Sequence, residues 1–216
     1  MSIRRYRPAD RAAVYDICVR TADAGGDARG RFATDDLMPD LFAGPYLHIQ
    51  PELAFVLADA PADRPVGYIL GTADTARFVE EYRREWIPLL RDKYPVPPDP
   101  PRTPDEQMVA MHYHPERMLL PELAGYPAHL HIDLLPDHQG RGHGRALMST
   151  WLAAAESAGA PAVHLGMVTT NTRARHFYDR TGFHLIPVRD AGPVTYLGRA
   201  LQQPRRGRSA PGATLP

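Results

Sequence analysis

A glycine-rich turn at residues 139–145, with the sequence QGRGHGR, is the segment best suited to bind a charged ligand. An alternating apolar strand pattern precedes it, and a helical pattern containing Leu147 and Trp151 follows it. The first N–H groups of a helix lack intrahelical partners and lie at the positive end of its dipole, so they attract phosphate oxygens. Glycine lets the main chain approach such an anion closely. A plain strand-to-helix turn is the alternative interpretation.

Better-known phosphate loops do not match these residues. A dinucleotide fingerprint requires G-x-G-x-x-G, whereas Gly140, Gly142 and Gly144 give G-x-G-x-G. A Walker A loop requires a Gly-Lys pair, and the only lysine of the chain is Lys93. The kinase signatures HRD and DFG are absent from the sequence.

Two motifs in a fixed order resemble those of the GNAT N-acetyltransferase superfamily. The first is L-x-P-D-H-Q-G-R-G-H-G-R-A-L at 134–147, and the second is N-x-x-A-x-x-F-Y-x-x-x-G-F at 171–183. The resemblance implies an α+β GNAT fold, in which helices flank a mixed, mostly antiparallel sheet. Two neighbouring strands of that sheet splay apart and admit acetyl-CoA.

A narrower resemblance covers most of the chain. The segments 13–18, 44–46, 85–88, 92–95 and 194–199 are similar to the C-terminal acetyltransferase-like domain of O-GlcNAcase. That domain also has an insertion like residues 74–128, but its animal members lack the glycine loop that this chain keeps. No glycoside hydrolase segment is present, so the resemblance implies a free-standing, bacterial-type acetyltransferase. A catalytically idle acyl-CoA-binding or peptide-binding module is the alternative.

The resemblance also implies which residues hold acetyl-CoA. Main-chain groups of two leucines would pair with the pantetheine arm, and the glycine turn would hold the pyrophosphate. An asparagine would bind the cofactor beyond the splay, and an arginine would meet an outer phosphate. The implied set is Leu134, Leu135, Gln139, Gly140, Arg141, Gly142, His143, Gly144, Arg145, Asn171, Arg173 and Tyr178.

Acetyl transfer to a primary amine requires a base for the amine and an acid for the departing thiolate. An amine with a pKa near 10.4 is neutral in only about one molecule in two thousand at pH 7. Tyr178 stands where the superfamily places the acid. Asp133, between apolar neighbours on its strand, is the leading base, and burial is expected to raise its pKa. His129, His131 and water remain alternatives, because both histidines share a strand face with Asp133.

Two patterns in the sequence have the spacing of metal ligands. His129, His131 and Asp133 alternate on one strand, and His112 and His114 form another His-x-His pair. Such spacing can hold a metal, but the superfamily needs none, so we expect none.

The elements that position these residues can be predicted along residues 1–201, which we expect to form a single domain. The segment 53–72 predicts a β-hairpin, and 128–134 and 162–168 predict strands before and after the glycine-turn helix. A helix at 171–181 and strands near 184–187 and 193–201 complete the sheet. Residues 74–128 read as a helical, proline-rich insertion that forms a substrate wall, and its glutamates Glu80, Glu81 and Glu85 suit a cationic acceptor. The remainder, 202–216, predicts a disordered basic tail.

Composition limits the other possibilities. The 216 residues carry a formal net charge of +0, which lacks the basic field of nonspecific nucleic-acid binders. Cys18 is the sole cysteine, which excludes an internal disulfide. No apolar run is long enough for a membrane span. We therefore expect a cytoplasmic monomer or homodimer that binds acetyl-CoA and an amine or peptide acceptor, with no nucleic acid or membrane as partner.

Overall fold

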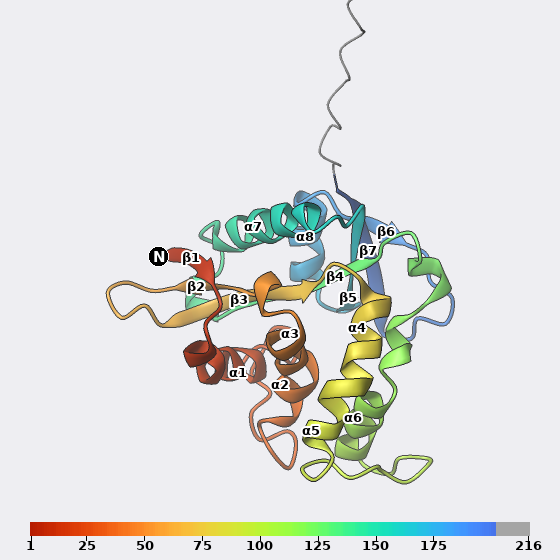
Figure 1. The fold of residues 1–216 in the computed structure, drawn as a ribbon. Coiled ribbons are helices and arrows are strands. Elements are labelled where there is room, and N and C mark those ends of the chain that lie inside the picture. The colour runs from red at the N-terminus through yellow and green to blue at the C-terminus, as the bar shows by residue number, and fades with distance from the viewer. Residues whose placement is uncertain (202–216) are drawn as a thin grey trace, which may run out of the picture.

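Seven strands form one sheet in the part of the chain that the structure, a computed structural model, describes. These residues are 1–201, so the predicted tail at 202–216 lies outside them. The sheet order is β1-β2-β3-β4-β5-β7-β6 (Figure 1). The strands are β1 (Ser2–Arg5), β2 (Phe55–Ala58), β3 (Pro65–Thr72), β4 (Ala128–Leu134), β5 (Ala162–Val168), β6 (His184–Ile186) and β7 (Val194–Ala200).

One parallel pair interrupts an otherwise antiparallel sheet. Strands β4 and β5 run parallel and pair only at Ala128–Val163 and His129–His164. All other neighbouring strands pair antiparallel. The two parallel strands extend beyond their shared pairs, so their C-terminal halves part. The mixed, mostly antiparallel and splayed sheet expected from the sequence is thereby confirmed.

Helices cover both faces of the sheet (Figure 1). One face carries α7 (His143–Ser157) and α8 (Thr172–Arg180). The opposite face carries the remaining helices, which include most of the insertion. These are α1 (Arg11–Val19), α2 (Leu37–Phe42), α3 (Gly44–Ile49), α4 (Thr75–Glu81), α5 (Ile87–Leu90) and α6 (Pro104–Tyr113).

Each face of the sheet has its own apolar core. Alternation along β3 sends Tyr68 and Leu70 into the core beneath α1–α6, and Ile69 into the core beneath α7. Each core contains one buried tryptophan whose indole N–H reaches a main-chain oxygen. Trp86 donates to Asp40 O at 2.9 Å, and Trp151 donates to Leu53 O at 2.9 Å.

The predicted insertion folds back onto α2 through a buried carboxylate. Asp40 is only 2% exposed, and it accepts hydrogen bonds from Tyr15, Tyr94 and Lys93. The Lys93 ammonium also contacts Asp36 at 2.7 Å. Burial alone lowers the pKa of Lys93, but the two carboxylates outweigh it and leave that pKa raised. The insertion is therefore pinned by a charged, hydrogen-bonded cluster.

The helical segment at the start of the insertion is not one regular α-helix. Tyr82–Trp86 form a π-helical turn between α4 and α5. Pro88 lies two residues after it, has no N–H for the helical ladder and needs room for its ring, which favours a widened turn. Ala128, which the expected insertion and the predicted strand 128–134 share, belongs to β4.

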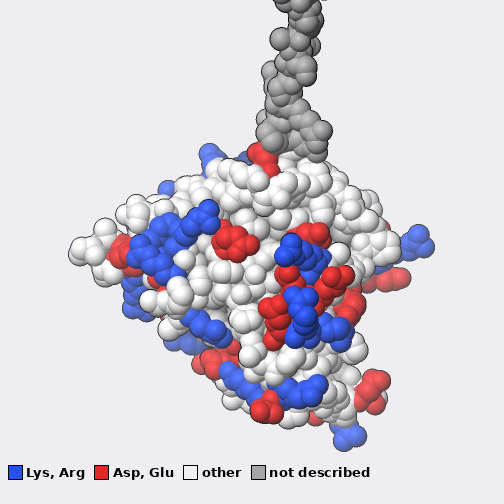
Figure 2. Space-filling view, viewed as in Figure 1, with Lys and Arg blue, Asp and Glu red and all other residues white. Residues whose placement is uncertain are grey.

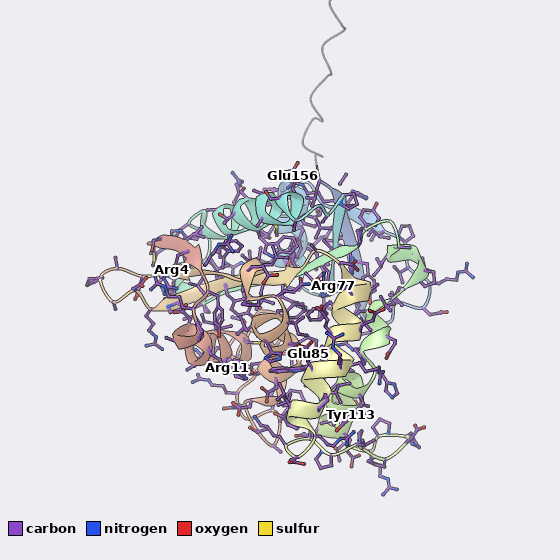
Figure 3. The ribbon with its side chains drawn as sticks, in the orientation of Figure 1. Arg4, Arg11, Arg77, Glu85, Tyr113 and Glu156 are labelled. Carbon is purple, nitrogen blue, oxygen red and sulfur yellow. The ribbon has the colours of Figure 1, made fainter. Side chains whose placement is uncertain are left out.

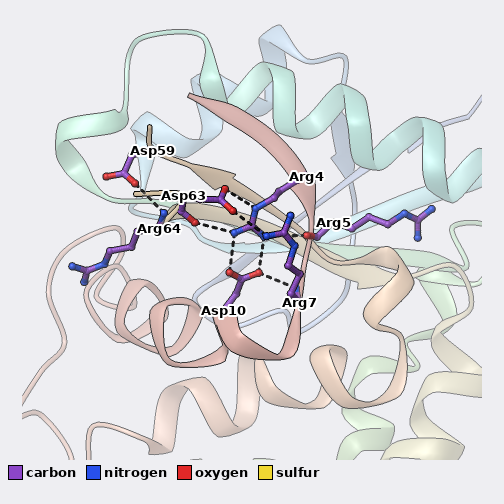
Figure 4. A network of polar contacts seen from close by, with 7 residues as sticks. All are labelled: Arg4, Arg5, Arg7, Asp10, Asp59, Asp63 and Arg64. Atoms are coloured by element: carbon purple, nitrogen blue, oxygen red, sulfur yellow. Dashed lines mark hydrogen bonds and ion pairs between the residues drawn. The ribbon is translucent and has the colours of Figure 1, made fainter. Parts of the chain in front are cut away.

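An ion-pair network fixes the N-terminal edge of the sheet (Figure 4). Arg4 on β1 contacts both oxygens of Asp10 at 2.7 and 2.9 Å, and its Nε lies 2.9 Å from Asp63 in the β2–β3 turn. Burial raises the pKa of Asp10, but hydrogen bonds from Arg4 and from the Arg7 N–H outweigh it, so that pKa is lowered. The network links β1, the start of α1 and the hairpin.

Candidate active site

A cavity of about 520 Å³ collects most of the residues that the sequence singles out. It lies where the end of β4, the glycine turn, the start of α8 and the segment after α1 meet. Three predicted residues do not line it: Leu135, Arg141 and His143. The predicted residues in its lining are Asp133, Leu134, Gln139, Gly140, Gly142, Gly144, Arg145, Asn171, Arg173 and Tyr178.

The glycine turn presents a run of free main-chain donors to this cavity. Within the described residues, none of the N–H groups from Gly140 to Arg145 has a hydrogen-bond acceptor, and the helical ladder starts with Ala146 N–H to Gly142 O. Gly140 and Gly142 have φ angles of 72° and 84°, a region that side chains disfavour. The turn is thus shaped to direct N–H groups towards an anion.

Positive side chains surround the same cavity. Arg145, Arg173 and Arg180 line it, and none of them pairs with a carboxylate in residues 1–201. Asp133 is the only carboxylate in the lining. Because unpaired arginines favour phosphate oxygens, the cavity suits a ligand with several phosphates and one reactive end near Asp133.

The free edge of β4 begins at Ile132 rather than at Leu135. Leu135 N–H donates to Val66 O at 3.0 Å, and it is therefore directed towards β3. Ladder hydrogen bonds alternate along a strand, so Ile132 and Leu134 present their N–H and C=O groups to the side where β5 has parted. The Leu134 carbonyl already accepts from Gln139 Nε2 at 2.7 Å. Leu135, expected to pair with a ligand, is occupied, and Ile132 takes its place in the lining.

Asp133 is held by a buried tyrosine from the neighbouring strand. Tyr68 is 2% exposed and donates its hydroxyl to Asp133 Oδ2 at 2.6 Å. Burial raises the pKa of Asp133 to about 6, although the hydroxyls of Tyr68 and Thr21 act in the opposite direction. The direction of this shift agrees with the expectation from the sequence.

Tyr178 reaches the cavity from α8. Its ring packs against Phe177 and Phe183, with centroids 5.3 and 5.7 Å away. Burial, and then the negative charge of Asp133, raise the pKa of the Tyr178 hydroxyl. This hydroxyl has no hydrogen-bond partner in the described chain and is not sealed off from the cavity. It is therefore a protonated donor without an acceptor.

Asn171 forms the wall of the cavity beside the segment that follows α1. Its Oδ1 caps α8 by accepting from Ala174 N–H at 3.0 Å, and its Nδ2 donates to Ala24 O at 3.0 Å. Thr21, Ala24 and Gly25 thereby become lining residues. The sequence indicates only a helix end near Gly25, so this wall cannot be predicted from it. The other lining residues not predicted are Ile132, Ala174, Phe177, Arg180 and Thr181.

The two alternative histidine bases lie outside the cavity lining. The Tyr46 hydroxyl bridges them, at 2.7 Å from His129 Nε2 and 3.1 Å from His131 Nε2. The two histidines of the other His-x-His pair, His112 and His114, differ in burial. His112 is fully enclosed and contacts Tyr82 through Nδ1. Residues 1–201 contain no group of three or more metal-ligating side chains suited to a metal ion.

The insertion does not line this cavity either. Its glutamates are largely neutralised, because Glu81 pairs with Arg77 and Glu85 pairs with Arg84. Figure 2 shows positive and negative groups interleaved on the side of the molecule where the insertion lies. Figure 3 shows Arg77 and Glu85 along the α4–α5 segment. The acidic lining expected for a cationic acceptor is therefore absent from the described cavity.

A larger depression of about 890 Å³ lies at the far end of α7. Its charged side chains are Arg5, Glu52, Asp74 and Arg77. None of the residues predicted to bind or react lines it, and opposite charges balance in its wall. It does not share the chemistry of the smaller cavity. No helix in residues 1–201 is both long and apolar enough to cross a bilayer.

Several known proteins are similar to this chain in sequence or in fold. The crystal structure of SsHAT is 60% identical and superimposes with a TM-score of 0.90, covering 94% of this chain and 98% of that one. Rat protein O-GlcNAcase is 28% identical over 204 residues, which are 93% of this chain but only 22% of that protein. The structure of yncA from Salmonella typhimurium, solved with its cofactor acetyl-CoA, shares the fold at 17% identity and a TM-score of 0.52, covering 99% of both chains.

The sequence pattern of the acetyltransferase (GNAT) family matches residues 27–183, which is most of the described chain. That range contains the splayed strand β4, the glycine turn and the helix that carries Tyr178. The chain therefore belongs to the acetyltransferase (GNAT) family, whose acetyl donor is acetyl-CoA.

Proposed function

We propose that this protein transfers the acetyl group of acetyl-CoA directly to a primary amine while both substrates are bound. The observation that carries the proposal is the run of unpaired N–H groups from Gly140 to Arg145 beside three unpaired arginines. A helix start of this kind binds diphosphates, and it borders the cavity that also contains Asp133. Acetyl-CoA supplies the acetyl group and a thiolate leaving group.

Each end of acetyl-CoA has matching groups in the cavity. The glycine turn and Arg145 would hold the pyrophosphate, and Arg173 would meet an outer phosphate. The free edge of Ile132 and Leu134 would pair with the amide groups of the pantetheine arm, as an added strand does. We therefore replace Leu135 by Ile132 among the residues expected to bind the cofactor.

Asp133 has properties suited to a general base. With a pKa of about 6, its carboxylate is mostly ionised at pH 7, yet it is more basic than an ordinary aspartate. It would take the proton of the attacking amine, directly or through water. The hydrogen bond from Tyr68 keeps one carboxylate oxygen fixed and leaves the other available.

Tyr178 has properties suited to the acid. Burial and Asp133 keep its hydroxyl protonated, and no described residue accepts its proton. A thiolate related to a thiol of pKa about 8.5 leaves more easily when a hydroxyl donates to its sulfur. Asp133 would thus act on the attacking amine and Tyr178 on the departing thiolate.

The proposal is tested by calorimetric titration with acetyl-CoA, followed by thiol release with lysine peptides, polyamines and amino sugars. Replacing Arg173 by Met is expected to raise the Kd for acetyl-CoA about tenfold, since one charged hydrogen bond is lost. Arg175→Met is the matched control, because Arg175 lies on the same helix but pairs with Asp179 and does not line the cavity.

Two results would count against the proposal in different ways. If acetyl-CoA binds but no amine in the panel is acetylated, the protein is an acyl-CoA-binding module rather than a working enzyme. If millimolar acetyl-CoA does not bind, the assignment of the glycine turn is wrong. If amines in the panel are acetylated, the one with the highest kcat/KM identifies the acceptor class.

A further inference from the structure

A chain of four polar side chains lies on the α3–α4 side of β4, outside the cofactor cavity. It consists of Thr75, His129, Tyr46 and His131, in that order of contact. The first three are nearly buried, at 5%, 5% and 3% exposed. His131 is only partly buried and forms the outer end of the chain.

The direction of every hydrogen bond in this chain can be derived. Thr75 Oγ1 lies 2.7 Å from Pro127 O, and a carbonyl can only accept, so the single hydroxyl proton of Thr75 is committed there. His129 Nδ1, 2.8 Å from the same Oγ1, must therefore carry a proton and donate. In a neutral imidazole the other nitrogen is then a bare acceptor.

The remaining two links follow from the first. Tyr46 donates to the bare Nε2 of His129 and has no second proton to give. His131 Nε2, 3.1 Å from the Tyr46 oxygen, must accordingly carry a proton and donate to it. The lone pair of a neutral His131 is thus forced onto Nδ1, which has no partner in the described residues and is not enclosed.

This chain cannot work as a proton relay to solvent. Its inner end is the carbonyl oxygen of Pro127, which does not pass a proton on. The physical effect of the chain is instead to select one tautomer of His131. An otherwise symmetric choice between two ring nitrogens is decided by a threonine three contacts away.

The charged and titratable surroundings keep both histidines neutral. Burial first, and then the charge of Arg117 and the nearby His164, lower the pKa of His131 to about 4. Burial, His164, His131 and Arg117 lower the pKa of His129 as well. Burial raises the pKa of the hydroxyls of Tyr46, Tyr82 and Tyr196, whereas the charge of Arg117 also acts on them and lowers the pKa of each. At pH 7 the outer ring is an uncharged hydrogen-bond acceptor.

The position of His131 connects the chain to the proposed reaction. His131 lies two residues after His129, the last residue of β4 that pairs with β5, and so lies where these two strands begin to part. It also shares a strand face with Asp133, two residues further on. A hydrogen-bond acceptor at this point can orient an amine on its way to the base.

We propose that His131 Nδ1 accepts a hydrogen bond from the N–H of the acceptor amine, and that Thr75, His129 and Tyr46 are positioning residues that keep its lone pair there. The inference rests on the proposed function for the identity of the acceptor. It adds a specific requirement, namely an acceptor with an N–H donor at the splay. His131 here holds the amine, while Asp133 removes its proton.

The tautomer is tested first, without any enzymatic assay. In protein labelled with ¹⁵N-histidine at pH 7, His131 is expected to carry its proton on Nε2. Thr75→Val removes the acceptor of His129 Nδ1–H, so each donor and acceptor in the chain reverses and the proton of His131 moves to Nδ1. Thr72→Val is the matched control, because Thr72 is a buried threonine that bonds Asp74 and not the chain.

Kinetics then test the role of the lone pair. Thr75→Val and Tyr46→Phe are expected to raise KM for the acceptor about tenfold, with KM for acetyl-CoA and the pH profile unchanged. His131→Asn places an amide oxygen near the position of Nδ1 and is expected to keep KM within a few-fold, whereas His131→Leu raises it as the chain variants do.

Three outcomes overturn the inference. They are a wild-type His131 protonated on Nδ1, a tautomer change in Thr75→Val without any change in acceptor KM, and a His131→Asn variant as impaired as His131→Leu. If no acceptor is turned over at all, the proposed function fails separately. The acceptor contact is then decided by adding a primary amine to the coenzyme-bound protein, where an unmoved His131 Nδ1 resonance refutes it.

Discussion

In the proposed mechanism, Asp133 and Tyr178 have different tasks within one cavity. Burial raises the pKa of both groups, but the raised pKa suits the carboxylate to accept a proton and the phenol to keep its own. The carboxylate becomes a better base near neutral pH, while the phenol stays protonated. Two titratable groups whose environments separate their roles are the usual basis of acid–base catalysis.

The first prediction concerns pH. Since Asp133 acts as a base only when ionised, kcat/KM for the acceptor should fall as the pH drops through about 6, and an ordinary aspartate would lose activity only at lower pH. Asp133→Asn should reduce kcat by about 10²-fold or more and remove this step from the profile. Asp137→Asn, an exposed aspartate beside the glycine turn, should retain both. An unchanged profile in Asp133→Asn would assign the base elsewhere.

The second prediction concerns the leaving group. Tyr178→Phe removes the hydroxyl but keeps the ring between Phe177 and Phe183. We expect kcat to fall about 10²-fold, while the Kd for acetyl-CoA changes little. Rapid-mixing measurement of thiol release in one turnover separates this step from product release. A wild-type rate in Tyr178→Phe would leave the phenol a packing residue, and Tyr196→Phe serves as the control.

Individual residues of the candidate site can be predicted from the sequence where they lie close together in the chain. Gly140, Gly142 and Gly144 form one local turn, and two of them, Gly140 and Gly142, adopt the positive φ angles that glycine permits. Tyr68 and Thr21 contact Asp133 from distant segments, and no local pattern marks them. Their roles depend on sheet register and on where α1 ends, which the sequence does not specify.

At the level of elements, the start of α7 does two things at once. Its first turn has no internal hydrogen bonds for its leading N–H groups, and Gly142 at the N-cap adopts a left-handed conformation. The geometry that leaves the donors free is therefore the geometry that a side chain resists.

The third prediction separates these two effects. Gly142→Ala and Gly159→Ala both place a Cβ in open space at positive φ, at opposite ends of α7. Each should cost about 1 kcal/mol of folding free energy. Only Gly142→Ala should also weaken acetyl-CoA binding, because its N–H groups border the cavity. Thermal unfolding and calorimetry give the two numbers, and equal affinities in the two variants would contradict the assignment.

The order and type of most elements followed from periodicity and turn residues, and the differences have local causes. The helix of the insertion widens into a π-helical turn ahead of Pro88, which has no N–H for the helical ladder. The free edge of β4 depends on which peptide groups β3 uses. Alternation alone cannot choose between Leu134 and its neighbour until the register with Val66 is known.

The whole molecule is built from two cores that meet at the sheet, and the α1–α6 side holds several neutral histidines. Burial lowers the pKa of His112 and of His131 to about 4, and lowers that of His129 and His164 as well. A histidine of this kind stabilises the fold only while it stays neutral. The unfolded chain takes up protons below about pH 6.5, and the folded chain does so only at lower pH.

The fourth prediction follows from this sign. The free energy of unfolding should fall as the pH is lowered from 6.5 towards 4, by about 1.4 kcal/mol per pH unit for each such histidine. The raised pKa of Asp133 acts oppositely and offsets about one of them. Urea denaturation at several pH values measures the slope. His112→Asn keeps an acceptor for the Tyr82 hydroxyl but does not titrate, so a slope unchanged in this variant would exclude His112 as a contributor.

The ammonium of Lys93, held between Asp36 and Asp40, has a practical consequence for testing the proposed acetylation of amines. It is the only lysine in the sequence, and its two carboxylates favour the charged form, which is not a nucleophile. An antibody against acetyl-lysine will thus detect the acetylated acceptor with little background from the protein's own side chains. Screening for that acceptor in crude peptide libraries becomes feasible without first removing the catalyst.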